Sequence, residues 1–187
     1  VLKRIFDLIF SLALIIMLFP LIIIIALLVK ADSSGPIIYW SDRVGKNNEI
    51  FSMPKFRTML EDTEDIATHL MKDPFKKITK LGLNLRNFSL DEIPQLFSIL
   101  KGDMSFVGPR PALYNQDDLI GLRTEKFVDS LVPGITGWAQ VNGRDELTIR
   151  QKVELDTEYL NRRSFFFDLF IILLTIKKVL FKSGVSH

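Results

Sequence analysis

The stretch that organises this chain is residues 89–111, which read SLDEIPQLFSILKGDMSFVGPRP. It sets two adjacent carboxylates, Asp91 and Glu92, at the head of a short apolar helix. Ser89 and Glu92 have the spacing of a capping box, which predicts that they cap this helix start. On that structural interpretation, the two acids only complement the positive end of the helix dipole. The alternative is that they carry chemistry, and the sequence that follows bears on the choice.

That segment ends in Gly108-Pro109-Arg110-Pro111. A proline on each side fixes φ and disfavours helix before each ring, so Arg110 is predicted to lie in extended backbone. An arginine presented in this way suits the recognition of a phosphate or a carboxylate. The combination favours a chemical role for Asp91 and Glu92.

The composition limits the kinds of function that are open to the chain. Its 187 residues are enough for one domain with a core. It has no cysteine, which excludes disulfides and thiolate metal sites, and two histidines argue against a histidine-rich metal site or a Ser-His-Asp triad. A net charge of +2 gives no indication of nucleic-acid binding.

A membrane segment is predicted near the N-terminus. Residues 8–29 carry no charge and would measure roughly 33 Å as a helix, enough to cross a bilayer core. Pro20 interrupts the segment, and Lys3, Arg4 and Lys30 flank it on both sides, so the positive-inside rule gives no orientation. Two solutions remain: a kinked helix that spans the bilayer, or a helix that breaks at Pro20 and returns. The residue pattern alone slightly favours the first, because prolines are tolerated in spanning helices.

After the membrane segment, a β-hairpin is predicted. Residues 37–40 and 49–53 are apolar, and the turn-rich residues 45–48 separate them. Lys55 and Arg57 then flank Phe56, a pattern that fits either a solvated edge strand or a phosphate-binding strand. Residues 61–77, 117–131 and 148–160 have helical patterns.

Residues 135–144 read ITGWAQVNGR and are rich in small and turn residues. Glycines such as Gly143 permit close backbone approach to a ligand, while Gln140, Asn142 and Arg144 supply polar groups. The strand-loop-helix context of a dinucleotide or Walker loop is missing, so we reject both of those.

A second apolar stretch occupies residues 165–181 and is too short to span a bilayer. Asp168, Thr175, Lys178 and Lys182 fall near one face of the predicted helix. A narrow polar stripe with lysines at the end is typical of an amphipathic helix that lies in the membrane interface. A buried core helix is the alternative.

Four motifs follow one another in an order seen in one family: KFRTM at 55–59, SLDEIPQL at 89–96, GDMSFVGPRP at 102–111 and PGITGWAQVNGR at 133–144. On these motifs the chain resembles the small monotopic phosphoglycosyl transferases, or bacterial sugar transferases. The resemblance covers nearly the whole chain. It does not include the extra N-terminal membrane domain that larger members have. Two positions depart from the pattern: Phe19 stands where many members have Ser before Pro20, and Val132 where many have a basic residue.

The resemblance implies a reaction. Such enzymes move a sugar 1-phosphate from a UDP-sugar to a membrane polyprenyl phosphate, expected here to be undecaprenyl phosphate, and release UMP. Asp91 would be the nucleophile and a ligand of the required Mg²⁺, and Glu92 would assist. Near a helix start, Asp91 is expected to stay ionised. Lys55, Arg57 and Arg110 would bind substrate phosphates, and Gln140, Asn142, Gly143 and Arg144 the nucleotide sugar.

The resemblance also implies a topology, which reverses the preference for a spanning helix. The membrane helix would break at Pro20, with both ends on the cytoplasmic side of the bacterial inner membrane. We therefore expect an α+β fold: a re-entrant membrane helix (1–34), a mainly helical cytoplasmic catalytic domain with a short β-hairpin (35–164), and an interfacial amphipathic helix and tail (165–187).

Two other functions stay open. One is a membrane-tethered, non-catalytic scaffold that binds a nucleotide sugar, which would need neither Asp91 nor Glu92. The other is a membrane-anchored phosphodiesterase with water as acceptor. The identity of the sugar, the pathway and the oligomeric state are not indicated by the sequence.

Overall fold

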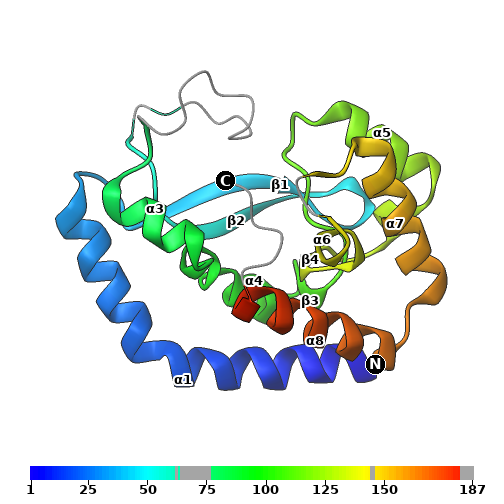
Figure 1. Ribbon diagram of the computed structural model, residues 1–187, viewed down its shortest axis with the longest axis horizontal. Helices are drawn as coiled ribbons and strands as arrows, with labels where there is room; N and C mark the ends of the chain where they lie inside the picture. The colour runs from blue at the N-terminus through cyan, green and yellow to red at the C-terminus, as the bar shows by residue number, and fades with distance from the viewer. Residues whose placement is uncertain (62, 64–76, 144–145, 182–187) are drawn as a thin grey trace.

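The computed structural model describes residues 1–61, 63, 77–143 and 146–181. Most of these residues form helices, arranged around a small antiparallel hairpin and above one long N-terminal helix (Figure 1). The elements, in chain order, are α1 (Leu2–Asp32), β1 (Ile38–Val44), η1 (Lys46–Asn48), β2 (Ile50–Phe56), α3 (Lys80–Asn87), η3 (Leu90–Glu92), α4 (Gln95–Lys101), β3 (Ser105–Val107), α5 (Asp117–Glu125), η4 (Val128–Ser130), β4 (Gly134–Thr136), α6 (Trp138–Val141), α7 (Ile149–Arg162) and α8 (Phe165–Phe181).

The predicted hairpin is confirmed, with longer strands than the apolar runs indicated. β1 and β2 pair antiparallel from Ile38–Phe56 at one end to Val44–Ile50 at the other. The turn passes through Asn47 and Asn48, whose φ values of 55° and 61° are left-handed. Asparagine tolerates this region better than most residues, which explains the turn at this point of the sequence.

Helix α1 is long and apolar enough to cross a membrane, as predicted. It runs along the base of the molecule and then bends upward (Figure 1), and Pro20 lies inside it. Proline is the residue type that most often kinks a helix, because it removes a backbone hydrogen bond and its ring crowds the preceding turn. The structure shows a bent helix. It does not by itself show a re-entrant path through a bilayer.

Both halves of α1 pack against the rest of the protein. Leu14 and Leu18 contact a core cluster that includes Met53 and Ile99. Further along the helix, Ile25 and Val29 belong to a second cluster with Phe56 and Leu85. The opposite side of α1 carries many exposed apolar side chains, among them Ile9, Ile16, Met17 and Leu27. One side of the helix therefore belongs to the core, and the other presents an apolar surface.

Polar contacts fix both ends of α1 to the same body. Near the start, Lys3 donates to the carboxylate of Asp168 at 2.7 Å, and Asp7 is buried and accepts from the hydroxyl of Ser105 at 2.8 Å. Just past the end, Arg57 donates to the backbone carbonyl of Ser33 at 2.6 Å. The start and the end of the apolar helix thus meet one globular unit.

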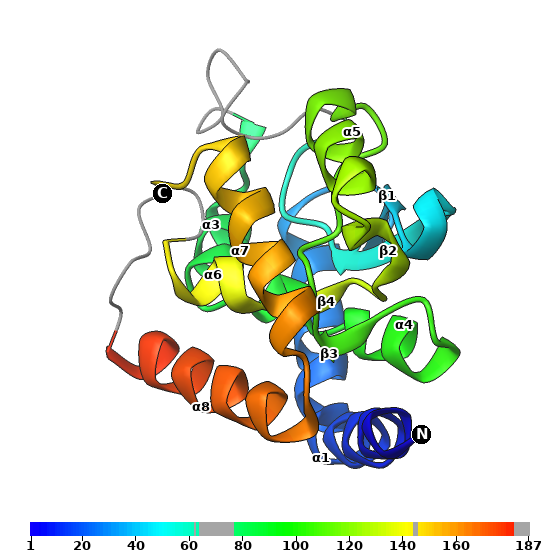
Figure 2. The same ribbon diagram turned by 90° about the vertical axis from the view of Figure 1, so that its right-hand side faces the viewer.

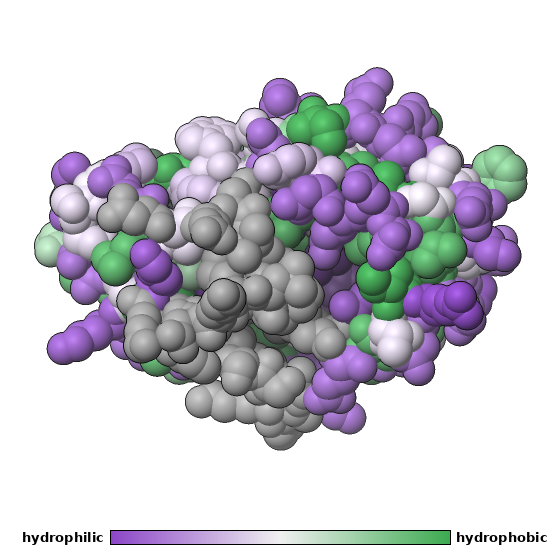
Figure 3. All heavy atoms as spheres, turned by 90° about the horizontal axis from the view of Figure 1, so that it is seen from above, coloured by the Kyte–Doolittle hydropathy of each residue, from purple (hydrophilic) through white to green (hydrophobic). Residues whose placement is uncertain are grey.

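Helix α8 has the predicted bounds. Two of its polar side chains bond within the fold: Asp168 accepts from the hydroxyl of Tyr159 at 2.6 Å, and the hydroxyls of Thr175 and Thr136 lie 2.7 Å apart. The exposed side carries Phe166, Phe170, Leu173, Ile176 and Val179. Figure 2 shows α8 at the base of the molecule beside the start of α1, so both helices present apolar side chains along the base. By contrast, Figure 3 shows that the opposite face is mainly hydrophilic around the grey atoms.

Other predicted elements are corrected by the structure. The helix expected over 117–131 ends at Glu125, and Phe127 (φ 59°) starts the separate turn η4. Residues 135–144, expected to form a loop, include β4 and the one-turn helix α6, and β4 pairs in parallel with β3. The helix predicted over 61–77 lies almost wholly outside the described residues.

Candidate active site

Asp91 and Glu92 lie in the 3-10 turn η3, between α3 and α4. The predicted capping box is wrong: Ser89 is left-handed (φ 53°) and makes no side-chain capping bond, and Glu92 is directed to other partners. A non-glycine residue in this region is strained, and such strain is retained where surrounding contacts determine the backbone. Pro94 then leads into α4, so the acids precede the helix by one turn. The turn thus presents them to the strands rather than to a helix end.

Glu92 is held by two cations from different parts of the chain. Its Oε1 accepts from Lys55 Nζ at 2.8 Å and from Arg110 Nη2 at 2.9 Å. Lys55 comes from β2, and Arg110 from the Gly108-Pro109-Arg110-Pro111 loop after β3. Burial alone would raise the pKa of Glu92, but Lys55 and Arg110 together hold it well below its usual range. Glu92 is therefore ionised at neutral pH.

Asp91 is buried beside the same charges, with 7% of its surface exposed. Burial raises the pKa of its carboxyl, while the charges of Lys55, Arg86 and Arg110 oppose this and that of Glu92 adds to it. Burial outweighs the favourable charges around Asp91, so its pKa shifts in the direction opposite to the one that a helix start would give. The expectation that Asp91 is ionised at neutral pH stays a prediction. The two neighbouring acids have opposite pKa shifts, a pattern typical of sites where two carboxyls have different tasks.

Arg86 is a member of the site that the sequence analysis missed. It lies in the last turn of α3, and its Nε donates to Thr58 Oγ1 at 2.9 Å. Burial lowers the pKa of Arg86, while the nearby charges of Asp91 and Glu92 raise it. No motif marked this arginine, because its position depends on how α3 packs against the strand end. With it, the described residues place three cations, Lys55, Arg86 and Arg110, around the two acids, and such a cluster suits an anionic ligand.

The arginine loop is fastened to the PGITG segment by close backbone contacts. Gly108 N–H donates to Thr136 O, and Gly134 N–H donates to Pro109 O, both at 2.9 Å. A Cβ on Gly134 would lie 2.1 Å from the Gly108 nitrogen, so only glycine fits there. Gly134, which precedes the segment 135–144 predicted to approach a ligand, is in close contact with neighbouring backbone, and this contact fixes the loop that carries Arg110.

Arg57 follows strand β2, and its side chain reaches the residue after the end of α1, Ser33. Arg57 is buried, its Nη2 donates to the carbonyl and hydroxyl of Ser33, and its Nε and Nη1 have no hydrogen-bond partner within the described part of the chain. A buried guanidinium with unsatisfied donors is able to receive an anion. The prediction that Arg57 binds a phosphate remains untested.

The predicted nucleotide-sugar residues lie in and after α6. The amide atoms of Gln140 are buried and have no partner among the residues described, while Asn142 is exposed and donates to Trp138 O at 2.8 Å. Gly143 has a φ of 150°, and Arg144 lies outside the described residues. Their role in binding the sugar nucleotide stays a prediction.

The donor set can be compared with what Mg²⁺ requires. In the described ranges, no group of three or more His, Asp or Glu side chains could hold a metal by itself. Mg²⁺ in phosphate-transfer sites is usually bound by one or two carboxylates and by the substrate phosphates. Lys55 and Arg110 already engage Glu92, so the buried oxygens of Asp91 are the carboxylate that fits this mode.

Two carboxyls with opposite pKa shifts thus lie among cations, in a protein whose helices α1 and α8 expose apolar side chains. The sequence matches the bacterial sugar transferase family over residues 1–182. The chain therefore belongs to the bacterial sugar transferase family, and it is an enzyme of the transferase class.

Several relatives agree. This chain is 42% identical to an undecaprenyl-phosphate glucose phosphotransferase of Komagataeibacter xylinus, over 96% of this chain and 36% of that protein. It is 41% identical to the uncharacterized sugar transferase EpsL of Bacillus subtilis, over all of this chain and 91% of EpsL. It is 37% identical to the UDP-glucose:undecaprenyl-phosphate glucose-1-phosphate transferase of Escherichia coli, over 95% of this chain and 40% of that protein. The chain thus spans less than half of the two relatives whose names state a reaction.

Proposed function

We propose that this protein transfers a sugar 1-phosphate from a UDP-sugar to a polyprenyl phosphate, through a covalent intermediate on Asp91. The observation that carries the proposal is the site itself: a buried Asp91 beside a Glu92 that Lys55 and Arg110 neutralise. The cations around the two acids suit a diphosphate, and the relatives' names point to undecaprenyl phosphate as the acceptor.

The transfer takes place in two displacements at one phosphorus. In the first, an oxygen of the Asp91 carboxylate bonds to the sugar-bearing phosphorus, the bond from that phosphorus to the bridging oxygen breaks, and UMP leaves with the electron pair. In the second, an oxygen of the lipid phosphate bonds to the same phosphorus and the bond to Asp91 breaks. The products are a polyprenyl diphosphate sugar and a free carboxylate. Splitting the transfer lets a soluble donor and a lipid acceptor use one site in turn.

Glu92 holds the cations in place in this mechanism. A general base works best with a pKa near the operating pH, whereas Lys55 and Arg110 keep the pKa of Glu92 far below it. A phosphate oxygen already carries negative charge and needs no base. Glu92 instead fixes Lys55 and Arg110 where charge develops on the phosphoryl oxygens.

Mg²⁺, held by Asp91 and the diphosphate, would neutralise charge on the leaving UMP. Lys55 and Arg110 orient the sugar-bearing phosphate for attack by Asp91. Arg57, with buried donors near the end of α1, is suited to the phosphate of the lipid acceptor.

The contacts at the two ends of α1 bear on the membrane arrangement. Because Lys3 and Asp7 at its start and Ser33 after its end contact one globular unit, a straight crossing of the bilayer would separate contacts that the structure makes together. These contacts support a re-entrant helix with both ends on the side of the catalytic domain, which we place on the cytoplasmic face. The exposed apolar sides of α1 and α8 would then lie in the acyl region, with α8 as an interfacial helix.

The reaction is tested by incubating the protein in membranes with a UDP-sugar labelled in the sugar, Mg²⁺ and undecaprenyl phosphate. The proposal requires label in the organic phase with equal UMP, and both lost in Asp91→Asn. Free sugar phosphate in water would indicate the phosphodiesterase instead. Binding of UDP-sugar with no product, for every common UDP-sugar, would indicate the scaffold.

A further inference from the structure

The backbone around Arg110 is held by a series of hydrogen bonds to its carbonyls. Pro109 O accepts from Gly134 N at 2.9 Å, and Ala112 O accepts from Val44 N at 2.9 Å. Between them, the carbonyl of Arg110 itself accepts from a side chain, Arg123 Nη1, at 2.8 Å. The residue whose guanidinium contacts Glu92 is thus held through its own carbonyl by a second arginine.

Arg123 is fixed in turn by a buried carboxylate. Its Nε and Nη2 lie 3.0 and 2.7 Å from Oδ2 of Asp156, which is 1% exposed. Arg123 lies in the last turn of α5 and Asp156 on α7, so the pair also joins two helices. The planar guanidinium serves both acceptors at once, since Nη1 reaches the loop while the other two nitrogens bind the acid. An ammonium group lacks this fork.

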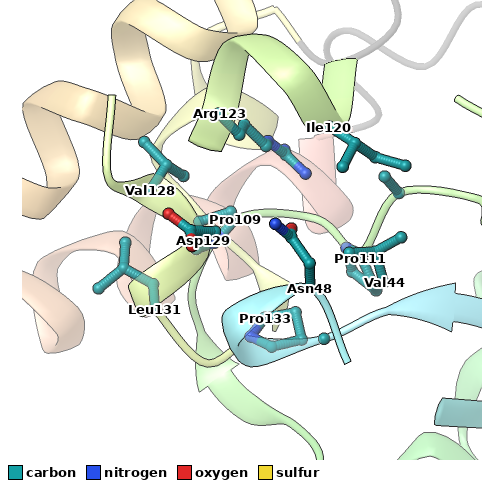
Figure 4. Close-up of a pocket in the computed structure, with 12 residues that line it drawn as sticks. Val44, Asn48, Pro109, Pro111, Ile120, Arg123, Val128, Asp129, Leu131 and Pro133 are labelled. Carbon is teal, nitrogen blue, oxygen red and sulfur yellow. The ribbon is translucent and has the colours of Figure 1, made fainter. Parts of the chain in front are cut away.

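The space behind the loop makes this contact important. A pocket lies against both prolines that flank Arg110, and Val128 and Arg123 form part of its lining. Figure 4 shows the Arg123 side chain extending from α5 toward the loop between Pro109 and Pro111. The turn borders this small pocket, and the hydrogen bonds to its carbonyls hold its backbone there.

We propose that Arg123, oriented by Asp156, is a positioning residue that sets Arg110 for phosphate binding. This inference rests on the proposed function, in which Arg110 binds the diphosphate of the UDP-sugar. Arg123 acts through the Arg110 carbonyl and does not touch substrate. No motif in the sequence pointed to it.

Arg123→Lys and the pair Arg123→Met/Asp156→Asn separate this role from folding. Lysine keeps a charge for Asp156 but cannot serve both acceptors, and the paired change removes both charges, so no buried ion is left alone. For both variants we expect the KM for the UDP-sugar to rise on the order of 10-fold or more, because a small misplacement of a binding group weakens its contact. Glu154→Gln, at an exposed position of α7, is the matched control and should leave KM unchanged.

KM distinguishes positioning from mere stability. Loss of folded protein lowers the maximal rate in proportion and leaves KM as it was, whereas positioning raises KM in protein whose melting temperature is retained. An unchanged KM in Arg123→Lys and in the paired variant overturns the proposal.

The Arg110→Ala background completes the test. In that background, Arg123→Met/Asp156→Asn should raise the KM for the UDP-sugar little further, because Arg123 acts through Arg110. A further rise in KM as large as the one seen without Arg110→Ala would overturn the proposal. If Arg110→Ala alone leaves KM unchanged, the phosphate role of Arg110 in the proposed function fails. If Arg110→Ala raises KM and the Arg123 variants do not, only the present inference fails.

Discussion

At the scale of single residues, Glu92 Oε1 joins the parts of the site. It accepts from Lys55 of the hairpin and from Arg110 of the loop after β3, while its neighbour Asp91 is buried with a raised pKa. Adjacent residues in a helical turn point in different directions, which is how two neighbouring acids come to have such different surroundings.

Replacing Glu92 by Gln should slow the reaction by roughly 10²–10³-fold, because it removes the charge that fixes Lys55 and Arg110. If Glu92 acts through these cations, the acid limb of the pH–rate profile should remain in Glu92→Gln. The comparison is between kcat/KM profiles of wild type and variant, with Asp103→Asn as a control. Disappearance of that limb would identify Glu92 as the titrating base.

The acid limb belongs to Asp91 in this account. Asp91 must be ionised to attack, and burial raises its pKa, so activity should fall on acidification at a higher pH than an ordinary aspartate would give. Lys55 lowers the pKa of Asp91, so Lys55→Met should move the limb to still higher pH. The measurement is kcat/KM against pH at constant ionic strength. A limb that moves to lower pH in Lys55→Met would contradict the assignment.

At the scale of elements, α8 combines a polar inward side with an apolar outward side. Asp168 and Thr175 bond within the fold, whereas Phe166 and Leu173 are 81% and 65% exposed. Such a helix can lie in a membrane interface, with its apolar side in the lipid, without crossing the bilayer.

A label at Leu173 tests this. The chain has no cysteine, so Leu173→Cys can carry a single polarity-sensitive fluorophore in nanodiscs. Its emission should be blue-shifted and quenched by brominated acyl chains. A label at Phe127, which is 74% exposed between α5 and η4, should behave as in water. Equal emission from both sites would mean that α8 does not enter the bilayer.

Local patterns predicted the elements that local forces determine. The hairpin turn follows from turn residues, and the helices over 165–181 and 148–160 follow from apolar periodicity, the second forming as α7. Ser89 misled the prediction because Glu92 gains more from Lys55 and Arg110 than from a capping bond. Arg86 and Arg123 were missed because their roles depend on how helices distant in sequence pack together.

At the scale of the whole molecule, the active site lies above an apolar base formed by α1 and α8. The polar contacts of Lys3 and Asp7 at one end and of Ser33 at the other tie both ends of α1 to one body. A re-entrant helix satisfies these contacts and the basic flanks together.

Cysteines introduced singly at Leu2 and Ser34 test the topology. A membrane-impermeant maleimide should label both from the cytoplasmic side of inverted vesicles, and neither from the periplasmic side of spheroplasts. The two positions serve as controls for each other, since a spanning helix would place them on opposite sides. Labelling of position 2 from the periplasm would rule out the re-entrant arrangement.

The central claim is that Asp91 becomes covalently attached to the sugar phosphate. The most direct measurement is intact-protein mass spectrometry after incubation with UDP-sugar and Mg²⁺, without polyprenyl phosphate. We expect an adduct of sugar-phosphate mass on the wild type, retained at lower yield in Glu92→Gln, absent from Asp91→Asn, and discharged when the lipid phosphate is added. Turnover without any adduct, with strictly sequential kinetics, would show direct transfer and contradict the account.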